Sequence, residues 1–181
     1  LNWSLDGAAY STQEPDASGL ATFSDDTLAF GTHTLVAEAT DTYGLTASDT
    51  VQFIVNGLPS SPVIHIDPDP AYTSDALAVV VDVDSVDPEG TPVAYQYQWS
   101  LNGQIQNTYT SNTIPSSATT KDDLWTVSVM PYDAFAYGVS AEVSMLVSNS
   151  EPLFLTPVTI SSTGTQVGGE WTCSASGFDQ D

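Results

Sequence analysis

Basic side chains are almost absent from this chain of 181 residues. It carries 23 aspartates and glutamates against one basic residue, Lys121, which gives a formal net charge of -22 at pH 7. Proteins bind nucleic acids and anionic lipid surfaces mainly through lysine and arginine, so this composition excludes both as partners. For the same reason, salt bridges cannot be a general source of stability.

Long apolar segments are missing as well. No run of about 18 apolar residues occurs, so we expect no membrane insertion in this segment. The chain does not open with a basic stretch followed by an apolar one, so no signal peptide is visible. It also begins without methionine, in what reads as the middle of a strand. We therefore expect it to be a piece of a longer protein.

Cys173 is the single cysteine, so no disulfide can form within the chain. It lies in a run in which Trp171, Cys173 and Ala175 alternate with small polar residues. This pattern predicts a small buried apolar side chain, and an intermolecular disulfide is the alternative.

Apolar residues are present in sufficient number for a packed core. They make up 41% of the chain, and aromatic residues make up 10%, which argues against disorder despite the charge. The acidic excess has three interpretations. It can form a solvated surface that prevents aggregation, it can be an adaptation to a salty medium, or some of the carboxylates can hold divalent cations.

The sequence contains an internal repeat with a spacing of 92 to 96 residues. Trp3-Ser4-Leu5-Asp6-Gly7 matches Trp99-Ser100-Leu101-Asn102-Gly103, and Val55-Asn56 with Pro59 matches Ser148-Asn149 with Pro152. Asp87 before Pro88-Glu89-Gly90 likewise resembles Asp179 before Gln180-Asp181. The repeat divides the chain into residues 57–148, a complete unit, residues 1–56, the C-terminal part of a preceding unit, and residues 149–181, the N-terminal part of a following unit.

Apolar and polar residues alternate with a period of two, which predicts antiparallel β-strands. The clearest case is the run from Val93 to Leu101, in which every second residue is apolar. Turn-forming clusters separate such runs, and no segment has a convincing helical pattern. The fold class is therefore all-β, with tandem two-sheet sandwiches. We expect five side chains inside the complete unit: Val81, Tyr97, Trp99, Val127 and Val143.

Two of these strands carry a resemblance to a known family. Tyr97-Gln98-Trp99-Ser100-Leu101-Asn102-Gly103 resembles the Tyr-x-Trp-x-x-x-Gly strand of PKD-like domains, and Trp125 to Asp133 resembles their later strand, which ends in Asp. Asn102-Gly103 stands where these domains usually have Gly-Asp-Gly, and an Ig-like or cadherin-like subfamily fits equally well. The resemblance is to tandem PKD-like and immunoglobulin-like β-sandwich repeats of large bacterial or archaeal extracellular proteins. It implies a structural role outside the cell.

No set of residues with the pattern of an active site is present. His33 and His65 occupy non-equivalent positions of different repeat units, and we expect both to face solvent. Neither has a cysteine or a second histidine at the spacing of a zinc site. The adjacent carboxylates Asp25-Asp26 and Asp122-Asp123 read as loop residues, and no glycine-rich phosphate loop occurs. We therefore expect no enzymatic activity.

Calcium is the one cofactor that the sequence suggests. Calcium is held by six to eight oxygens, mostly from carboxylates and carbonyls in loops. Acidic residues gather between positions 82 and 89, and an aspartate recurs at equivalent positions of two repeat units. The candidate ligands are Asp84, Asp87, Glu89, Asp133 and Asp41. The alternative is that Asp87 and Asp133 only cap turns through the backbone.

Two functions fit these observations. The first is a non-catalytic structural segment of a long extracellular or cell-surface protein, such as a stalk, adhesin or filament. Its partners would be copies of itself or adjacent repeats, joined head to tail. The apolar faces of the two partial units would then complete each other, with Leu35, Val51 and Phe53 on one and Ile160, Trp171 and Cys173 on the other.

The alternative function is a carbohydrate-binding or spacer module of a secreted hydrolase, with surface glycans as partners. Exposed aromatic side chains would have to form the sugar platform, and Tyr10, Tyr109 and Tyr137 are the candidates. The alternating positions of Trp3, Trp99 and Trp125 instead predict that these three fill the core.

Overall fold

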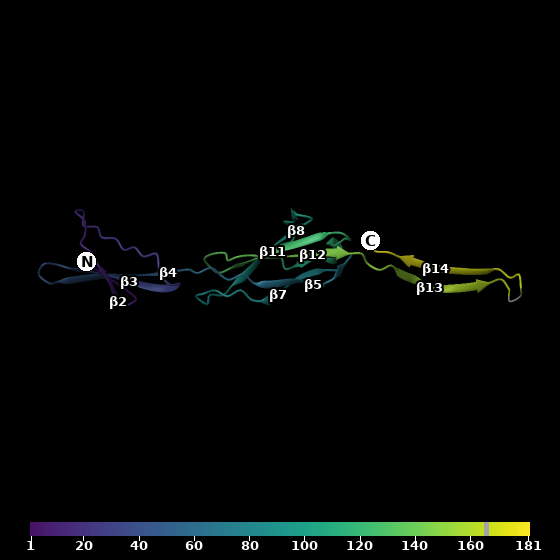
Figure 1. Cartoon of the computed structure of the whole chain (residues 1–181), viewed down its shortest axis with the longest axis horizontal. Coiled ribbons are helices and arrows are strands. Elements are labelled where there is room, and N and C mark those ends of the chain that lie inside the picture. The colour runs from purple at the N-terminus through teal and green to yellow at the C-terminus, as the bar shows by residue number, and fades with distance from the viewer. Residues whose placement is uncertain (165–166) are drawn as a thin grey trace. The chain divides into compact units, whose positions relative to one another are not determined.

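A computed structural model of the chain describes residues 1–164 and 167–181 (Figure 1). The fold is all-β: apart from one 3₁₀ turn, η1 (Ser116–Ala118), every regular element in these ranges is a strand. No helix of the described residues is long and apolar enough to cross a membrane. The chain forms two compact units, one of residues 1–60, 86–94 and 132–139, and the other of residues 61–85, 95–131 and 140–181.

The first unit contains a four-stranded antiparallel sheet in the order β2-β1-β3-β4, called the first sheet below. Its strands are β1 (Asn2–Leu5), β2 (Ala8–Thr12), β3 (Gly31–Thr40) and β4 (Thr46–Val55). β3 and β4 pair along their whole length and are joined by a tight turn at Asp41. The carboxylate of Asp41 accepts the backbone N–H groups of Tyr43 and Leu45, so this aspartate stabilises its own turn.

The second unit contains two sheets that pack into a sandwich, called the central sandwich below. A three-stranded sheet has the order β10-β7-β5, and a five-stranded sheet has the order β6-β12-β11-β8-β9. The strands are β5 (Val63–Asp67), β6 (Ala71–Tyr72), β7 (Leu77–Val83), β8 (Ala94–Leu101), β9 (Gln104–Ile105), β10 (Thr113–Ile114), β11 (Leu124–Tyr132) and β12 (Ala141–Ser148). The predicted all-β sandwich is therefore confirmed.

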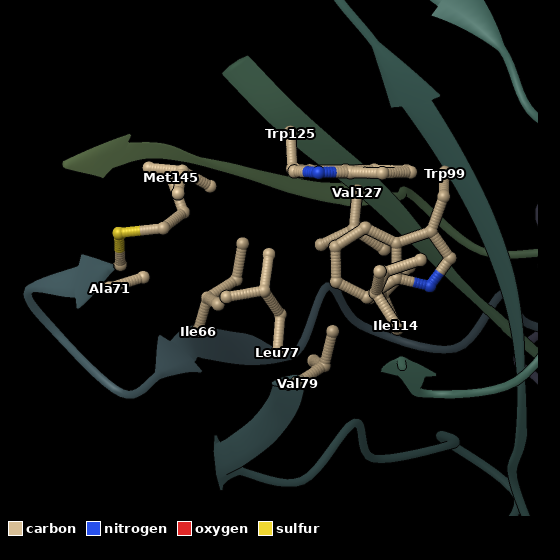
Figure 2. Close-up of a cluster of buried hydrophobic side chains, with 11 residues drawn as sticks. Ile66, Ala71, Leu77, Val79, Trp99, Ile114, Trp125, Val127 and Met145 are labelled. Atoms are coloured by element: carbon tan, nitrogen blue, oxygen red, sulfur yellow. The ribbon is translucent and has the colours of Figure 1, made fainter. Parts of the chain in front are cut away.

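The core of the central sandwich lies between its two sheets, which both contribute side chains (Figure 2). Trp99 and Trp125 are its largest members, and their rings meet edge to face with centroids 6.1 Å apart. The indole N–H of Trp99 donates to the backbone oxygen of Ser111 at 2.8 Å, so this polar atom is satisfied inside the core. Apolar burial on this scale supplies most of the stability of a small sandwich.

The predicted interior of the complete unit is largely confirmed. Trp99 and Val127 are fully buried. Tyr97 and Val143 are half-buried and pack against the core, and Val81 is half-buried.

The sheet topology recurs along the chain. The neighbours β2-β1-β3-β4 of the first sheet correspond to β9-β8-β11-β12 of the central sandwich. Even the turns agree. Asp6 and Gly7 have φ of 51° and 78°, and Asn102 and Gly103 have φ of 50° and 80°, the left-handed values of a two-residue hairpin turn. The sequence repeat thus appears as one repeated sheet.

The last two strands form a hairpin by themselves, called the C-terminal hairpin below. β13 (Leu153–Ser162) pairs antiparallel with β14 (Trp171–Phe178), and both strands are exposed along their whole length. Cys173 and Trp171 are exposed, so the prediction that Cys173 is buried is wrong for a single chain. The physical reason is that no second sheet covers this hairpin within the described residues.

Candidate functional site

The loop after β7 is organised by Asp87, which is only 4% exposed. Its Oδ1 accepts the backbone N–H groups of Glu89 at 3.0 Å and Thr91 at 2.9 Å. The backbone oxygen of Asp87 also accepts the N–H of Gly90 at 3.1 Å. Asp87 therefore caps this turn, and it uses only Oδ1 of its two carboxylate oxygens to do so.

Asp133 organises the loop after β11 in the same way, and it too is only 4% exposed. Its Oδ1 accepts the N–H groups of Phe135 at 2.6 Å and Ala136 at 2.7 Å, and its Oδ2 accepts the Asn56 amide at 3.1 Å. Burial by itself would raise the pKa of Asp133. The hydrogen bonds from Ala136, Phe135 and Asn56 outweigh it, and the pKa is lowered. Asp133 is therefore held as a carboxylate.

The segment that follows β4 is fixed to the same two loops. The N–H of Gly57 donates to Oε1 of Glu89 at 2.9 Å, and the Asn56 amide donates to the Gly57 oxygen at 2.8 Å. Three stretches that are distant in sequence thus meet within the first unit. Five residues make up this junction site: Asn56, Gly57, Asp87, Glu89 and Asp133.

Two carboxylate oxygens of the junction site are buried and accept no N–H or hydroxyl group from the described residues. They are Oδ2 of Asp87 and Oε2 of Glu89. A side-chain hydrogen bond with Asp87 also lowers the pKa of Asp133, so the two carboxyl groups are neighbours. An uncompensated buried carboxylate oxygen is costly, so this is an unusual place for acidic side chains.

The structure separates the five calcium candidates into two sets. Asp87, Glu89 and Asp133 meet at the junction site. Asp41 is exposed in its own hairpin turn, and Asp84 is exposed and accepts the Tyr95 hydroxyl at 3.2 Å. In the described part of the chain, no three acidic, histidine or cysteine side chains already stand in an arrangement that could hold a metal ion.

Sequence reasoning missed Asn56 and Gly57 as members of the site. Asn56 belongs to the repeated landmark, Val55-Asn56 against Ser148-Asn149, and Gly57 follows it, so the repeat itself was a signal for both residues. The second copy of that landmark has the same hydrogen bonds within the second unit. The Asn149 amide donates to the Ser150 oxygen at 2.7 Å, the Ser150 N–H donates to Asp181 at 2.9 Å, and the Asp181 N–H donates to Asp179 at 3.3 Å.

His33 is buried, so the prediction that it faces solvent is wrong. Its Nδ1 lies 2.8 Å from Oδ2 of Asp6, and its Nε2 lies 2.8 Å from the backbone oxygen of Ala29. Both partners are acceptors, so both ring nitrogens must carry protons and the imidazole is cationic. The hydrogen bonds to Ala29 and then Asp6 raise the pKa of His33. His65, in contrast, is exposed and bonded to Asp82, as expected.

We expect the stability of the first sheet to fall as the pH rises above the ordinary histidine pKa of about 6.5. Because the folded-state pKa of His33 is raised, its contribution is complete below the unfolded-state pKa and is lost as the pH passes the folded-state value. Chemical denaturation over this pH range measures the slope. His33→Gln should flatten it. An equal slope in His33→Gln and the parent chain would contradict this assignment.

The candidate sugar-binding tyrosines do not form a shared platform. Tyr109 packs edge to face against Trp125 of the core, with ring centroids 5.7 Å apart. Tyr10 donates its hydroxyl to Asp25, and Tyr137 lies 5.5 Å from Tyr132 between ring centroids. No family model matches the chain, and no curated protein matches it either.

Proposed function

We propose that the chain is a non-catalytic structural segment of a long extracellular repeat protein, such as a surface stalk, adhesin or filament, which assembles head to tail. One observation carries the proposal: the first sheet and the C-terminal hairpin are the counterparts of the two opposing sheets of the central sandwich. The first sheet corresponds to β9-β8-β11-β12, and the hairpin β13-β14 corresponds to β5-β7. Each is half of a sandwich.

The first sheet has an apolar side equivalent to the buried side of the central sandwich. Trp3 lies opposite Ala37 and Leu35 lies opposite Val51 in the strand register, so these side chains share one face. This face has a hollow lined by Trp3, Leu35, Ala37 and Val51, with Asp49 and Thr50 at its polar side. Leu35 is already buried, whereas Val51 is 53% exposed. An exposed apolar side chain next to a hollow favours a docking partner.

The C-terminal hairpin has a matching apolar side. Trp171 and Cys173 lie 92 residues after Val79 and Val81, which face the interior of the central sandwich or its margin. Ile160 lies directly opposite Cys173, so it shares their face. Trp171 is 60% exposed and Ile160 is 64% exposed. In a hairpin this short, such a face needs a covering sheet to be stable.

The occupant that fits the first sheet is therefore the C-terminal hairpin of a second copy, or the equivalent hairpin of an adjacent repeat. The contact joins two different surfaces, so it is heterologous and extends into a filament rather than closing as a dimer. The location outside the cell is supported by the extreme acidity and by the resemblance to tandem PKD-like repeats. A surface of one charge sign keeps such an assembly soluble.

Sedimentation velocity over a concentration series tests the proposal. We expect the parent chain to associate as concentration rises, and Trp171→Asp to remove the association because a carboxylate would be buried at the contact. Phe178→Asp is the matched control. It lies on the same strand, with 52% exposure, but on the opposite face. A monomer at all concentrations, or equal effects of the two variants, would contradict the proposal.

A further inference from the structure

We propose that Asp41 of a second copy completes a second junction in this chain, where its carboxylate accepts the side-chain amide of Asn149. The residues of this second junction all belong to the second unit: Asn149, Ser150, Asp179 and Asp181. The inference rests on the proposed head-to-tail assembly and names the polar contact that fixes how two copies align. The junction site has the same contact within one chain, between Asn56 and Asp133.

Three hydrogen bonds are common to the two junctions. The asparagine amide donates to the backbone oxygen of the next residue, at 2.8 Å for Asn56 and 2.7 Å for Asn149. The N–H of that next residue donates to an acidic side chain, Glu89 or Asp181, at 2.9 Å in both cases. The N–H of this acidic residue donates to the aspartate two positions before it, at 3.0 Å in the junction site and 3.3 Å in the second junction. The second junction therefore repeats the local geometry of the junction site.

One contact of the junction site has no counterpart in the second junction. Asn56 also donates to Oδ2 of Asp133 at 3.1 Å, and Asp87 lies beside the same carboxylate. The exposed Asn149 amide, in contrast, donates to no carboxylate within the described residues. An amide has two N–H groups, so one of them stays available. The second junction thus has a donor where the junction site has a donor and its carboxylate.

Asp41 is the repeat counterpart of Asp133 and has the matching acceptor. Its Oδ1 caps its own turn, as Oδ1 of Asp133 does, and no described residue donates to its Oδ2. Asp41 is exposed, and Tyr43, two residues later, is 91% exposed. The counterpart of Tyr43 is Phe135, which lines a pocket together with Asn56. The Asp41 turn therefore presents to solvent a carboxylate and an aromatic ring that the junction site uses.

The proposed assembly brings these groups together. The three parts of the junction site are the segment before β5, the loop after β7 and the loop after β11. When the C-terminal hairpin takes the place of β5-β7 on the first sheet of a second copy, their counterparts are the segment before β13, the residues after β14 and the turn after β3. The first two belong to one copy, and the third, with Asp41, belongs to the next. The second junction is therefore completed only at the contact between copies.

Charge makes this contact selective. It brings Asp41 toward Asp179, as Asp133 and Asp87 approach each other in the junction site. The amide of Asn149 supplies the donor that offsets the repulsion. A hairpin docked at another position along the first sheet would lose this donor and still meet the surface of a chain with a net charge of -22. The contact therefore favours one alignment of the two copies.

Sedimentation velocity at physiological ionic strength, which screens the general repulsion between acidic chains, tests the contact. Asn149→Asp should weaken association about tenfold or more, because a carboxylate then faces Asp41 in place of a donor. Asp41→Asn should also weaken it, since the hydrogen bond loses its charged acceptor, while the new side-chain oxygen can still cap the turn. The double variant should associate nearly as the parent chain does, because the amide and the carboxylate have exchanged places.

Two variants that add the same charge as Asn149→Asp are the controls. Asn56→Asp places it in the junction site, at the opposite end of the β3-β4 hairpin from Asp41. It should lower the melting temperature and leave the association constant unchanged, whereas Asn149→Asp should leave the melting temperature of the dilute chain unchanged. Asn107→Asp, in an exposed turn, should change neither quantity.

The outcomes separate this contact from the assembly itself. If Trp171→Asp removes association but Asn149→Asp and Asp41→Asn each associate like the parent chain, the assembly stands and the contact is overturned. Failure of the double variant to restore association overturns the contact in the same way. A parent chain that stays monomeric at every concentration overturns both proposals.

Discussion

Replacing Trp99 by alanine is expected to lower the free energy of unfolding of the central sandwich by about 3–5 kcal/mol. The indole is fully buried between the two sheets, in contact with Trp125, and its N–H has a backbone acceptor at 2.8 Å. Alanine would leave a large cavity and a backbone oxygen, that of Ser111, without its partner. Equilibrium denaturation followed by circular dichroism measures the loss.

Two variants show whether burial causes this effect. Trp99→Phe replaces the indole by a smaller aromatic ring without an N–H, so it leaves a smaller cavity and should cost less than Trp99→Ala. Trp3→Ala is the matched control at the repeat-equivalent position, where the side chain is only half-buried. It should also cost less, because less apolar surface is lost. Equal costs for Trp3→Ala and Trp99→Ala would contradict the assignment of Trp99 to a closed core.

Replacing Gly57 by alanine is expected to destabilise the first unit by about 1–3 kcal/mol, the usual cost of overpacking. A Cβ at this position would lie 2.7 Å from Cγ of Pro88 and 3.0 Å from Cγ of Phe30. The Gly57 N–H also donates to Glu89, so a shift of the backbone would loosen the junction site. Thermal denaturation measures the change.

Gly164→Ala is the control for this substitution. A Cβ there would meet no atom within 4 Å, so alanine should be neutral or slightly stabilising through the unfolded state. If Gly57→Ala behaves like Gly164→Ala, the close packing around Gly57 does not contribute to stability. The comparison separates the effect of the close contacts around Gly57 from the general effect of replacing a glycine by alanine.

The strands and the core of the central sandwich could be predicted because their signals are local. Alternation around Trp99 places its side chain on one face, and the Asn102-Gly103 turn fixes the hairpin. Exposure of Cys173 could not be predicted, because alternation shows which face is apolar but not whether another sheet covers it. The bonds of His33 to Asp6 and Ala29 depend on how a loop folds back, and periodicity carries no such information.

The candidate site was predicted in part for the same reason. Asp87 and Glu89 are close in sequence, so their proximity follows from a single turn. Asp133 joins them because the loop after β11 and the segment after β4 meet within one compact unit. Asp41 has the equivalent position in its repeat and also caps a turn, but its carboxylate accepts only backbone N–H groups of its own hairpin turn. Equivalent sequence positions therefore gave two different environments.

The most direct test of head-to-tail assembly is the rate at which a thiol reagent labels Cys173, the single thiol of the chain. Cys173 is exposed and lies on the face of the C-terminal hairpin that we propose covers the first sheet of a second copy. We predict slow labelling at high protein concentration and fast labelling after dilution, with Trp171→Asp labelled fast at both concentrations. Fast labelling of the parent chain that does not change with concentration would contradict the proposal.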